Sequence, residues 1–249
     1  MNYRHIALAA ALIGTSIAGS ASAEPRAVIE LFTSQGCSSC PAADKLAGEL
    51  AHDSSLLIMS LPVDYWDYLG WKDTLALHGH TVRQRAYAAA RGDREVYTPQ
   101  IVVNGVVHVL GSDKAAIENA IEQTRRAAAP LSVPVTMTVA DGKVTVNVPA
   151  ASGDNSKGEV WLCSISSKVP VAIGRGENSG RTLTYTNVVR GWVKLGEWTG
   201  KAQTFSLPVN ELSRGDVSPN DIDRVDVVVQ SGAAAKPGLM LGAATASLR

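Results

Sequence analysis

The chain has 249 residues, of which 45% are hydrophobic, and its 23 lysine and arginine residues equal its 23 aspartate and glutamate residues in number. This length suits one large domain or two ordinary ones. The balanced charge and the absence of a basic block or a glycine-rich phosphate loop speak against nucleic-acid, anionic-membrane and nucleotide binding. We therefore expect no nucleic-acid partner.

Residues 1–23 have the pattern of a secretory signal peptide. The basic residue Arg4 precedes an apolar run over 6–19, and Ala21-Ser22-Ala23 is typical of a cleavage site. The run is short for a bilayer span, although an uncleaved anchor is the alternative, and no later run is long enough for one. We expect a periplasmic or secreted mature chain that starts near Glu24 and has no transmembrane segment.

A strand, a helix and a strand are predicted next. Apolar runs cover 27–34 and 56–63, and apolar residues recur at helical spacing over 40–52. Two such strands joined through a helix predict a right-handed parallel crossover. An aromatic block, residues 64–73, follows the second strand directly, at the edge where open α/β sheets carry their sites.

A second helix is predicted at 81–90, and a third at 113–128. Between them, Asn104-Gly105 separates β runs at 101–103 and 106–110. This dipeptide predicts a hairpin, because both residues accept a positive φ. The predicted order up to residue 130 is therefore β-α-β-α-β-β-α.

After residue 130 the spacing changes to strict alternation of apolar and polar residues. The predicted strands lie at 133–139, 144–148, 159–165, 182–190, 191–198, 202–207, 222–230 and 239–247. About eight short strands without a helix predict an all-β sandwich over 131–249.

The chemistry centres on a C-x-x-C, Cys37 and Cys40, where the first strand turns into the first helix. Backbone N–H groups and the helix dipole stabilise a thiolate in that position. We interpret the pair as redox-active, with Cys37 attacking and Cys40 resolving. A structural disulfide, or half of a zinc or copper site, is the alternative, but no second C-x-x-C or H-x-x-x-H is present for zinc, and we assign no metal site. We interpret Cys163 as a buried thiol, with partnership to the pair or metal ligation as alternatives.

The predicted order, with the cysteine pair after the first strand, resembles the thioredoxin fold. Five stretches resemble the bacterial family of exported, thioredoxin-like proteins that is catalogued as a domain of unknown function: 30–41, 63–73, 83–87, 97–100 and 187–190. The expected fold class is thus an α/β thioredoxin-like domain over 24–130, followed by an all-β sandwich domain over 131–249. Ser38-Ser39 departs from the dipeptides of familiar thioredoxins, which leaves the direction of the redox reaction open.

The thioredoxin resemblance implies roles for two residues outside the pair. Pro99 is the expected cis-proline facing the cysteines. Glu30 is the expected buried carboxylate that accepts a proton from the resolving cysteine, although Glu30 facing solvent is the alternative. The aromatic block and the residue before the proline are candidates to bind substrate, with aromatic core packing as the alternative: Trp66, Tyr68, Trp71 and Thr98.

Together these features predict an exported thiol–disulfide oxidoreductase without a cofactor. Its substrate is an extracytoplasmic thiol or disulfide, either protein or small molecule, and its redox partner is unknown. One alternative is a copper-binding chaperone that uses His78 and His80 with the cysteine pair. The other is a non-catalytic recognition module that binds through its β domain.

Overall fold

The computed structural model describes residues 24–153, 156–213 and 217–248, so the predicted signal peptide, residues 1–23, lies outside the described residues. The helices are α1 (Cys40–Leu50), α2 (His78–Arg91) and α3 (Lys114–Ala128), with short 3-10 turns η1 (Asp67–Leu69), η2 (Val209–Glu211) and η3 (Pro219–Asp221). The strands are β1 (Ala27–Thr33), β2 (Leu56–Pro62), β3 (Gln100–Val103), β4 (Val107–Leu110), β5 (Thr136–Ala140), β6 (Lys143–Val148), β7 (Gly158–Ala172), β8 (Thr182–Trp198), β9 (Gln203–Pro208), β10 (Arg224–Ala233) and β11 (Lys236–Ser247). In the described part of the chain, the helices are too short or too polar to cross a membrane.

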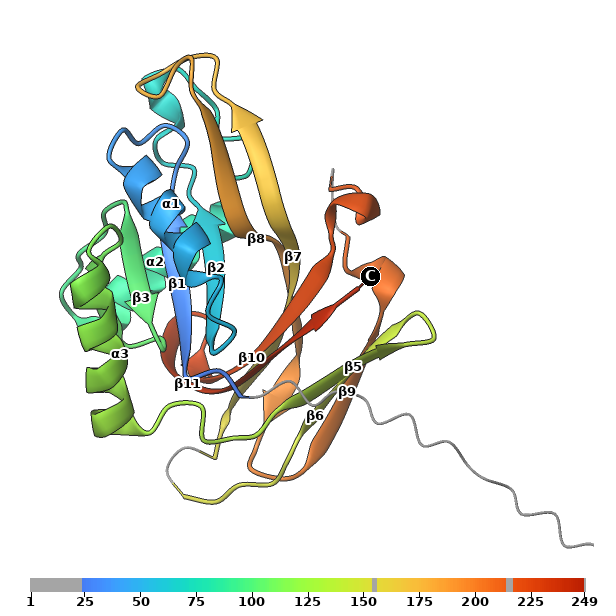
Figure 1. The fold of residues 1–249 in the computed structure, drawn as a ribbon. Helices are drawn as coiled ribbons and strands as arrows, with labels where there is room; N and C mark the ends of the chain where they lie inside the picture. The colour runs from blue at the N-terminus through green and yellow to red at the C-terminus, as the bar shows by residue number, and fades with distance from the viewer. Residues whose placement is uncertain (1–23, 154–155, 214–216, 249) are drawn as a thin grey trace, which may run out of the picture.

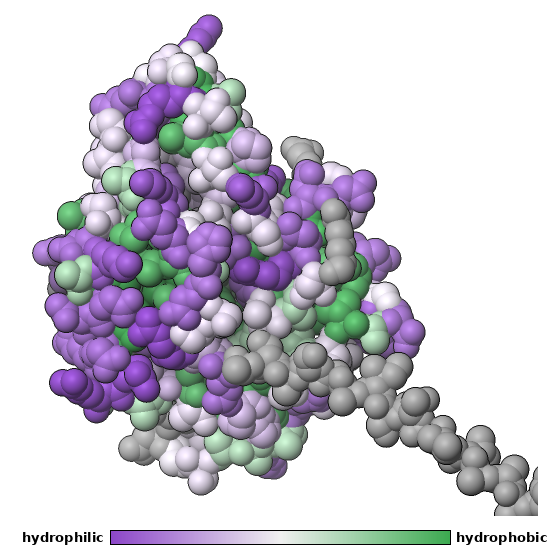
Figure 2. Space-filling view, in the orientation of Figure 1, coloured by the Kyte–Doolittle hydropathy of each residue, from purple (hydrophilic) through white to green (hydrophobic). Residues whose placement is uncertain are grey.

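A mixed sheet of eight strands, in the order β11-β10-β7-β8-β2-β1-β3-β4, forms the body of the molecule (Figure 1). A second sheet of three strands, β5-β6-β9, lies beside it. β1 runs parallel to β2 and antiparallel to β3, and all residues of β1 and β2 are buried, as their continuous apolar runs predict. Figure 2 shows that hydrophilic residues cover most of the face on which α1 and α3 lie.

The predicted fold class, a thioredoxin-like domain followed by a β-sandwich, is wrong. The described residues are mostly β, with 42% of them in strands and 22% in helices, and strands from both sides of residue 130 pair in the same eight-stranded sheet. The runs predicted separately at 182–190 and 191–198 are one strand, β8, which passes through Gly191 with a shift in its register against β7. Alternation identifies strands and their faces, but it does not specify which strands pair.

The secondary-structure elements predicted before residue 130 agree with the structure, although the predicted fold class does not. The elements from β1 to α3 occur in the predicted order. Asn104 and Gly105 have φ angles of 50° and 78°, as the hairpin requires. The domain bounds 24–130 and 131–249 stay a prediction.

One hydrophobic cluster joins the two parts of the sequence. It contains Val28, Phe32 and Tyr87 from before residue 130, and Ile165 and Met240 from after it. Backbone hydrogen bonds also tie the segment after α3 to β11, because the N–H of Leu131 donates to the carbonyl oxygen of Met240 over 3.0 Å. Burial in a shared cluster makes each half contribute to the stability of the other.

A buried ion pair links β1 to α2 on the same side of the sheet as this cluster. Glu30 is fully buried, and Arg83 Nε donates to Glu30 Oε1 over 2.6 Å. The Tyr87 hydroxyl donates to the other carboxylate oxygen, and the Arg83 guanidinium lies 4.5 Å from the ring centroid of Trp192. Arg83 also donates to Gln230 of β10 over 2.9 Å. A buried carboxylate needs such compensation, so the solvent-facing alternative for Glu30 does not hold.

We expect a single cooperative unfolding transition, because the shared cluster crosses residue 130. Ile165→Ala should lower the free energy of unfolding by about 2–5 kcal/mol through loss of buried contacts. Tryptophan fluorescence and far-ultraviolet circular dichroism, followed in denaturant, should report coincident transitions before and after the substitution. Two separate transitions, of which Ile165→Ala shifts one, would contradict this expectation.

The ion pair predicts unequal effects of removing its two members. Arg83→Met leaves the buried Glu30 carboxylate without a cation and should cost about 3–5 kcal/mol. Glu30→Gln keeps one acceptor oxygen, which can serve Arg83, and Arg83 is itself 11% exposed and still donates to Gln230, so this change should cost less. Denaturant midpoints of both variants measure the difference, and a larger cost for Glu30→Gln would show that the carboxylate is not the group that needs compensation.

Candidate functional site

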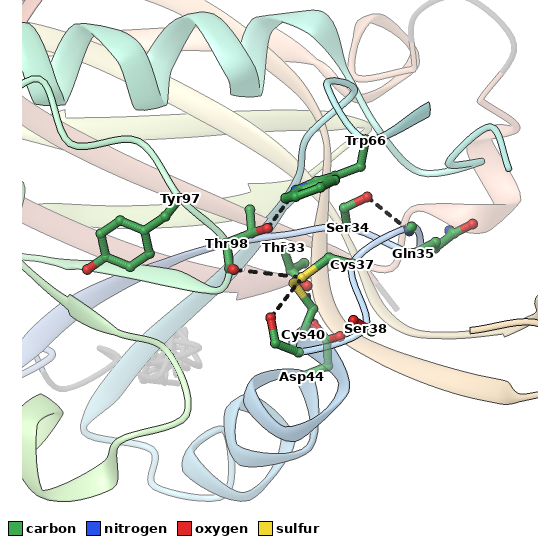
Figure 3. Close-up of a disulfide and its surroundings, with 12 residues drawn as sticks. Thr33, Ser34, Gln35, Cys37, Ser38, Cys40, Asp44, Trp66, Tyr97 and Thr98 are labelled. Atoms are coloured by element: carbon green, nitrogen blue, oxygen red, sulfur yellow. Dashed lines mark hydrogen bonds between the residues drawn. A yellow bond between two sulfur atoms is a disulfide. The ribbon is translucent and has the colours of Figure 1, made fainter. Parts of the chain in front are cut away.

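The two cysteines lie at the start of α1 and form a disulfide, with their Cα atoms 5.4 Å apart (Figure 3). Cys40 is the first residue of α1, and Pro41 follows it in the first turn, where its missing N–H costs least. Cys37 is 3% exposed and Cys40 is fully buried. The hydroxyl of Ser39, the N-cap residue, lies 3.3 Å from Cys37 Sγ. The positive end of the α1 dipole and the Ser39 hydroxyl therefore both lie near the sulfur atom of Cys37.

The predicted proline and tryptophan come together at the pair. The Thr98–Pro99 peptide bond is cis, as expected, and the Thr98 carbonyl oxygen lies 3.7 Å from Cys37 Sγ. Trp66 Nε1 donates to Thr98 Oγ1 over 2.7 Å (Figure 3). Trp66 also packs on Gly36, where an added Cβ would lie 3.2 Å from Trp66 Cβ, so a side chain there would require Trp66 to shift by a few tenths of an ångström.

The remaining two aromatic candidates have different surroundings. Tyr68 is 76% exposed and stacks on Trp66, with ring centroids 6.1 Å apart. It therefore offers an exposed aromatic ring next to Trp66. Trp71 is directed instead to the loop before the pair, where its Nε1 donates to Gln35 Oε1 over 2.8 Å. Trp71 thus supports the loop, and Trp66 and Tyr68 are the better placed of the three to meet a substrate.

The structure does not bring Glu30 to the cysteines. Glu30 alternates with Ile29 and Leu31 along β1, and these two residues pack with α1 and α3, so Glu30 faces the other side of the sheet, where α2 lies. Its carboxylate is already engaged by Arg83 and Tyr87. The predicted proton acceptor is therefore separated from the pair by the sheet.

A different buried carboxylate, Asp44, lies beneath the pair. Asp44 follows Cys40 by four residues on α1, so the two side chains share one helix face (Figure 3). Thr33 Oγ1 donates to Asp44 Oδ1 over 2.7 Å, and Asp44 Oδ2 has no hydrogen-bond partner in the described residues. Burial, as the largest cause, raises the pKa of Asp44 to about 8. Sequence reasoning missed this residue, although its helical spacing from Cys40 was a visible signal.

The connection between β7 and β8 supplies further residues that sequence reasoning missed. Asn178, which is 1% exposed, donates through Nδ2 to the carbonyl oxygens of Gln35 and Cys37, over 2.9 Å each. The exposed Glu177 accepts a hydrogen bond from the N–H of Ser38 over 3.1 Å. No local pattern in the sequence links residues that lie about 140 positions apart, so only the strand pairing reveals this contact.

The histidines named for a copper site are not arranged around the pair. His78 is exposed and contacts Asp64 through Nδ1 over 2.8 Å, whereas His80 is fully buried with Nδ1 2.9 Å from the carbonyl oxygen of Pro62. The described residues contain no group of three or more histidine, cysteine, aspartate or glutamate side chains suited to a metal. Cys163 is buried and unpaired, and burial raises the pKa of its thiol.

Comparison with known proteins connects this arrangement to a family. Residues 28–230 match the family model described as "Protein of unknown function (DUF1223)". A crystal structure of a protein from Agrobacterium tumefaciens is similar at 31% identity and a TM-score of 0.76, over 89% of this chain and 94% of that chain. HBP35 of Porphyromonas gingivalis, at 13% identity and a TM-score of 0.57 over 90% of this chain and 76% of that chain, shares the fold alone. Comparison with curated proteins gives no match. The resemblance to a bacterial family of unknown function is thereby confirmed, and the chain belongs to the DUF1223 family.

Proposed function

We propose that this protein is an exported thiol–disulfide oxidoreductase whose redox centre is the pair Cys37 and Cys40. The observation that carries the proposal is the position of the pair at the N-terminus of α1, with the Thr98 carbonyl oxygen 3.7 Å from Cys37 Sγ. The signal-peptide pattern of residues 1–23 supports an extracytoplasmic location, where disulfide substrates persist. The reaction needs no cofactor, because the two sulfur atoms carry the electrons.

The proposed reaction proceeds through a mixed disulfide. The Cys37 thiolate attacks one sulfur of a substrate disulfide, a bond forms between the two sulfurs, and the other substrate sulfur leaves as a thiolate. Cys40 then loses its proton and attacks Cys37 Sγ, which closes the Cys37–Cys40 disulfide and releases the second substrate thiolate. Two electrons pass from the pair to the substrate, whose thiolates take up protons. The reverse sequence oxidises a substrate dithiol.

Asp44 is the group best placed to take the proton from Cys40. It shares a helix face with Cys40, and one of its oxygens has no hydrogen-bond partner in the described residues. A pKa of about 8 lets the carboxyl group both accept and return a proton near neutral pH. Asp44 also lines a groove of about 460 Å³ between α1 and β8, through which protons can exchange with solvent. Glu30, held by Arg83, stays a structural residue in this scheme.

Cys40→Ser should trap the mixed disulfide, because the variant retains the attacking thiol but not the resolving one. Mass mapping after incubation with a disulfide such as oxidised glutathione should find the adduct on Cys37. The matched control, Cys37→Ser, should give little adduct, since Cys40 is fully buried. The wild-type chain, poised in dithiol buffers, should interconvert between dithiol and disulfide. A pair that stays in one state at all physiological potentials would refute the proposed function.

Asp44→Asn should slow closure of the Cys37–Cys40 disulfide from a mixed disulfide at Cys37 by at least about tenfold at neutral pH, because the proton acceptor is removed. Rapid mixing with alkylation quench measures this rate. Glu122→Gln, the same type of change at an exposed position of α3 outside the groove, is the control and should leave the rate unchanged. An unaltered rate in Asp44→Asn would exclude this role.

The same variant should alter how stability depends on pH. The folded chain keeps a proton on Asp44 up to about pH 8, whereas the unfolded chain loses it near pH 4, so stability falls as pH rises between these values. Asp44→Asn lacks this decline. Denaturant midpoints of both chains at pH 5 and pH 8.5 should therefore diverge in favour of the variant. His80 is present in both chains and its pKa is lowered chiefly by burial, so its effect on the comparison cancels.

A further inference from the structure

The tip between β7 and β8, residues 173–181, lies over the loop that carries the cysteines. In Figure 1 this connection lies at the same end of the molecule as the loop between β1 and α1. The tip packs on Trp71, because a Cβ added at Gly174 or Gly176 would lie 3.3 Å from Trp71 atoms. β7 and β8 thus carry a segment from the second half of the sequence into contact with the redox loop.

Asn178 fixes how the tip sits. Its amide donates to two carbonyl oxygens of the loop, and Arg181 Nη1 donates to Asn178 Oδ1 over 3.0 Å, which determines the orientation of the amide. The tip is closed on itself by backbone hydrogen bonds between Ile173 and Arg181 and between Gly180 and Ile173. Glu177, next to Asn178, is therefore held beside Ser38.

Glu177 places a carboxylate at the N-terminus of α1. The first turn of α1 contains no acidic residue, and the N-cap Ser39 makes no side-chain capping hydrogen bond. Glu177 Oε2 accepts from the N–H of Ser38, the residue next to Cys37. Glu177 therefore occupies the Ser38 N–H as a hydrogen-bond donor and adds a negative charge near the sulfur atom on which the Cys37 thiolate forms.

We propose that Glu177 is a positioning residue that opposes formation of the Cys37 thiolate and thereby shifts the pair towards the disulfide. Two negative charges at one helix terminus repel each other, so the thiolate and the carboxylate compete for the same positive potential. Only the reduced pair can ionise, so a readily formed Cys37 thiolate stabilises the dithiol state relative to the disulfide. The charge of Glu177 disfavours this thiolate and so removes part of that stabilisation. This inference rests on the proposed function for its consequence, but its effect on the thiolate does not.

The other titratable and charged groups around the loop are distributed over the elements packed against it. They are Cys40 and Asp44 of α1, Asp73 after η1, and the two arginines of the tip, the exposed Arg175 and Arg181. Burial raises the pKa of Asp44 to about 8, so this carboxyl group is mostly protonated at neutral pH, and Arg181 is directed to Asn178. Burial raises the pKa of Asp73 only to about 6, so Asp73 is mostly charged at neutral pH, but it accepts from the N–H of Gln35, two residues before Cys37. Glu177 is thus the carboxylate of this set that bonds to the residue beside Cys37.

Glu177→Gln tests the inference, because the amide keeps an acceptor for the Ser38 N–H and removes only the charge. In the reduced chain, alkylation of Cys37 as a function of pH, located by mass mapping, measures the thiolate fraction. We expect about two- to fivefold more thiolate below the midpoint of the titration than in the wild-type chain. Glu211→Gln, an exposed glutamate on η2, gives the matched control with the same change in net charge and should match the wild type.

Two further measurements separate the possible outcomes. The excess of thiolate in Glu177→Gln should shrink in about 1 M salt, where the Debye length is about 3 Å. In glutathione buffers above the titration midpoint, the variant should be shifted towards the dithiol by a similar factor. An unchanged thiolate fraction in Glu177→Gln would overturn the inference. A changed fraction in a pair that never exchanges with glutathione would uphold the effect of Glu177 on the thiolate and refute the proposed oxidoreductase.

Discussion

The hydrogen bonds from Asn178 to the carbonyl oxygens of Gln35 and Cys37 are the contact on which the arrangement of the site depends. A loop that leaves a buried strand and enters a helix must find partners for its own backbone groups, and this loop finds two of them in a side chain from the second half of the chain. Asn178 is held at the end of β7 and β8, and these strands are fixed between β10 and β2 in the eight-stranded sheet. The position of the cysteine loop is therefore tied to strands that follow it by more than 100 residues.

The two buried carboxylates near the start of the chain are distinguished by their partners. Glu30 meets a guanidinium, a phenol and, through Arg83, the amide of Gln230, which together replace the water lost on burial. Asp44 meets one hydroxyl, and in the part of the chain that the structure describes no cation pairs with it. An uncompensated carboxyl group responds by holding its proton, so it exchanges a proton near neutral pH. Of the two buried carboxyl groups, the one with fewer compensating contacts, Asp44, is therefore the one suited to proton transfer.

The sequence allowed the local features of the site to be predicted, but not the long-range ones. The strand before Cys37, the helix after Cys40 and the turn at Asn104-Gly105 follow from periodicity and turn chemistry within short windows. The family resemblance pointed to Pro99. Asn178 was missed because pairing between β7 and β8 decides where it lies, and the alternation of a strand is silent on its partner. Asp44 was missed for a different reason, since a search for apolar residues at helical spacing passes over a polar residue on the buried face.

The contacts of Cys37 show how its charge is balanced. The dipole of α1 and the hydroxyl of Ser39 favour a thiolate, whereas the Thr98 carbonyl oxygen and the Glu177 carboxylate oppose it. The dipole and Ser39 belong to α1 and its N-cap, and Thr98 lies just before β3, whereas Glu177 belongs to the tip between β7 and β8. Because thiolate and carboxylate share one helix terminus, their free energies are linked, and a displacement of Glu177 favours the thiolate as strongly as the thiolate favours the displacement. The ease with which Cys37 forms a thiolate and the position of the tip that carries Glu177 are therefore thermodynamically linked.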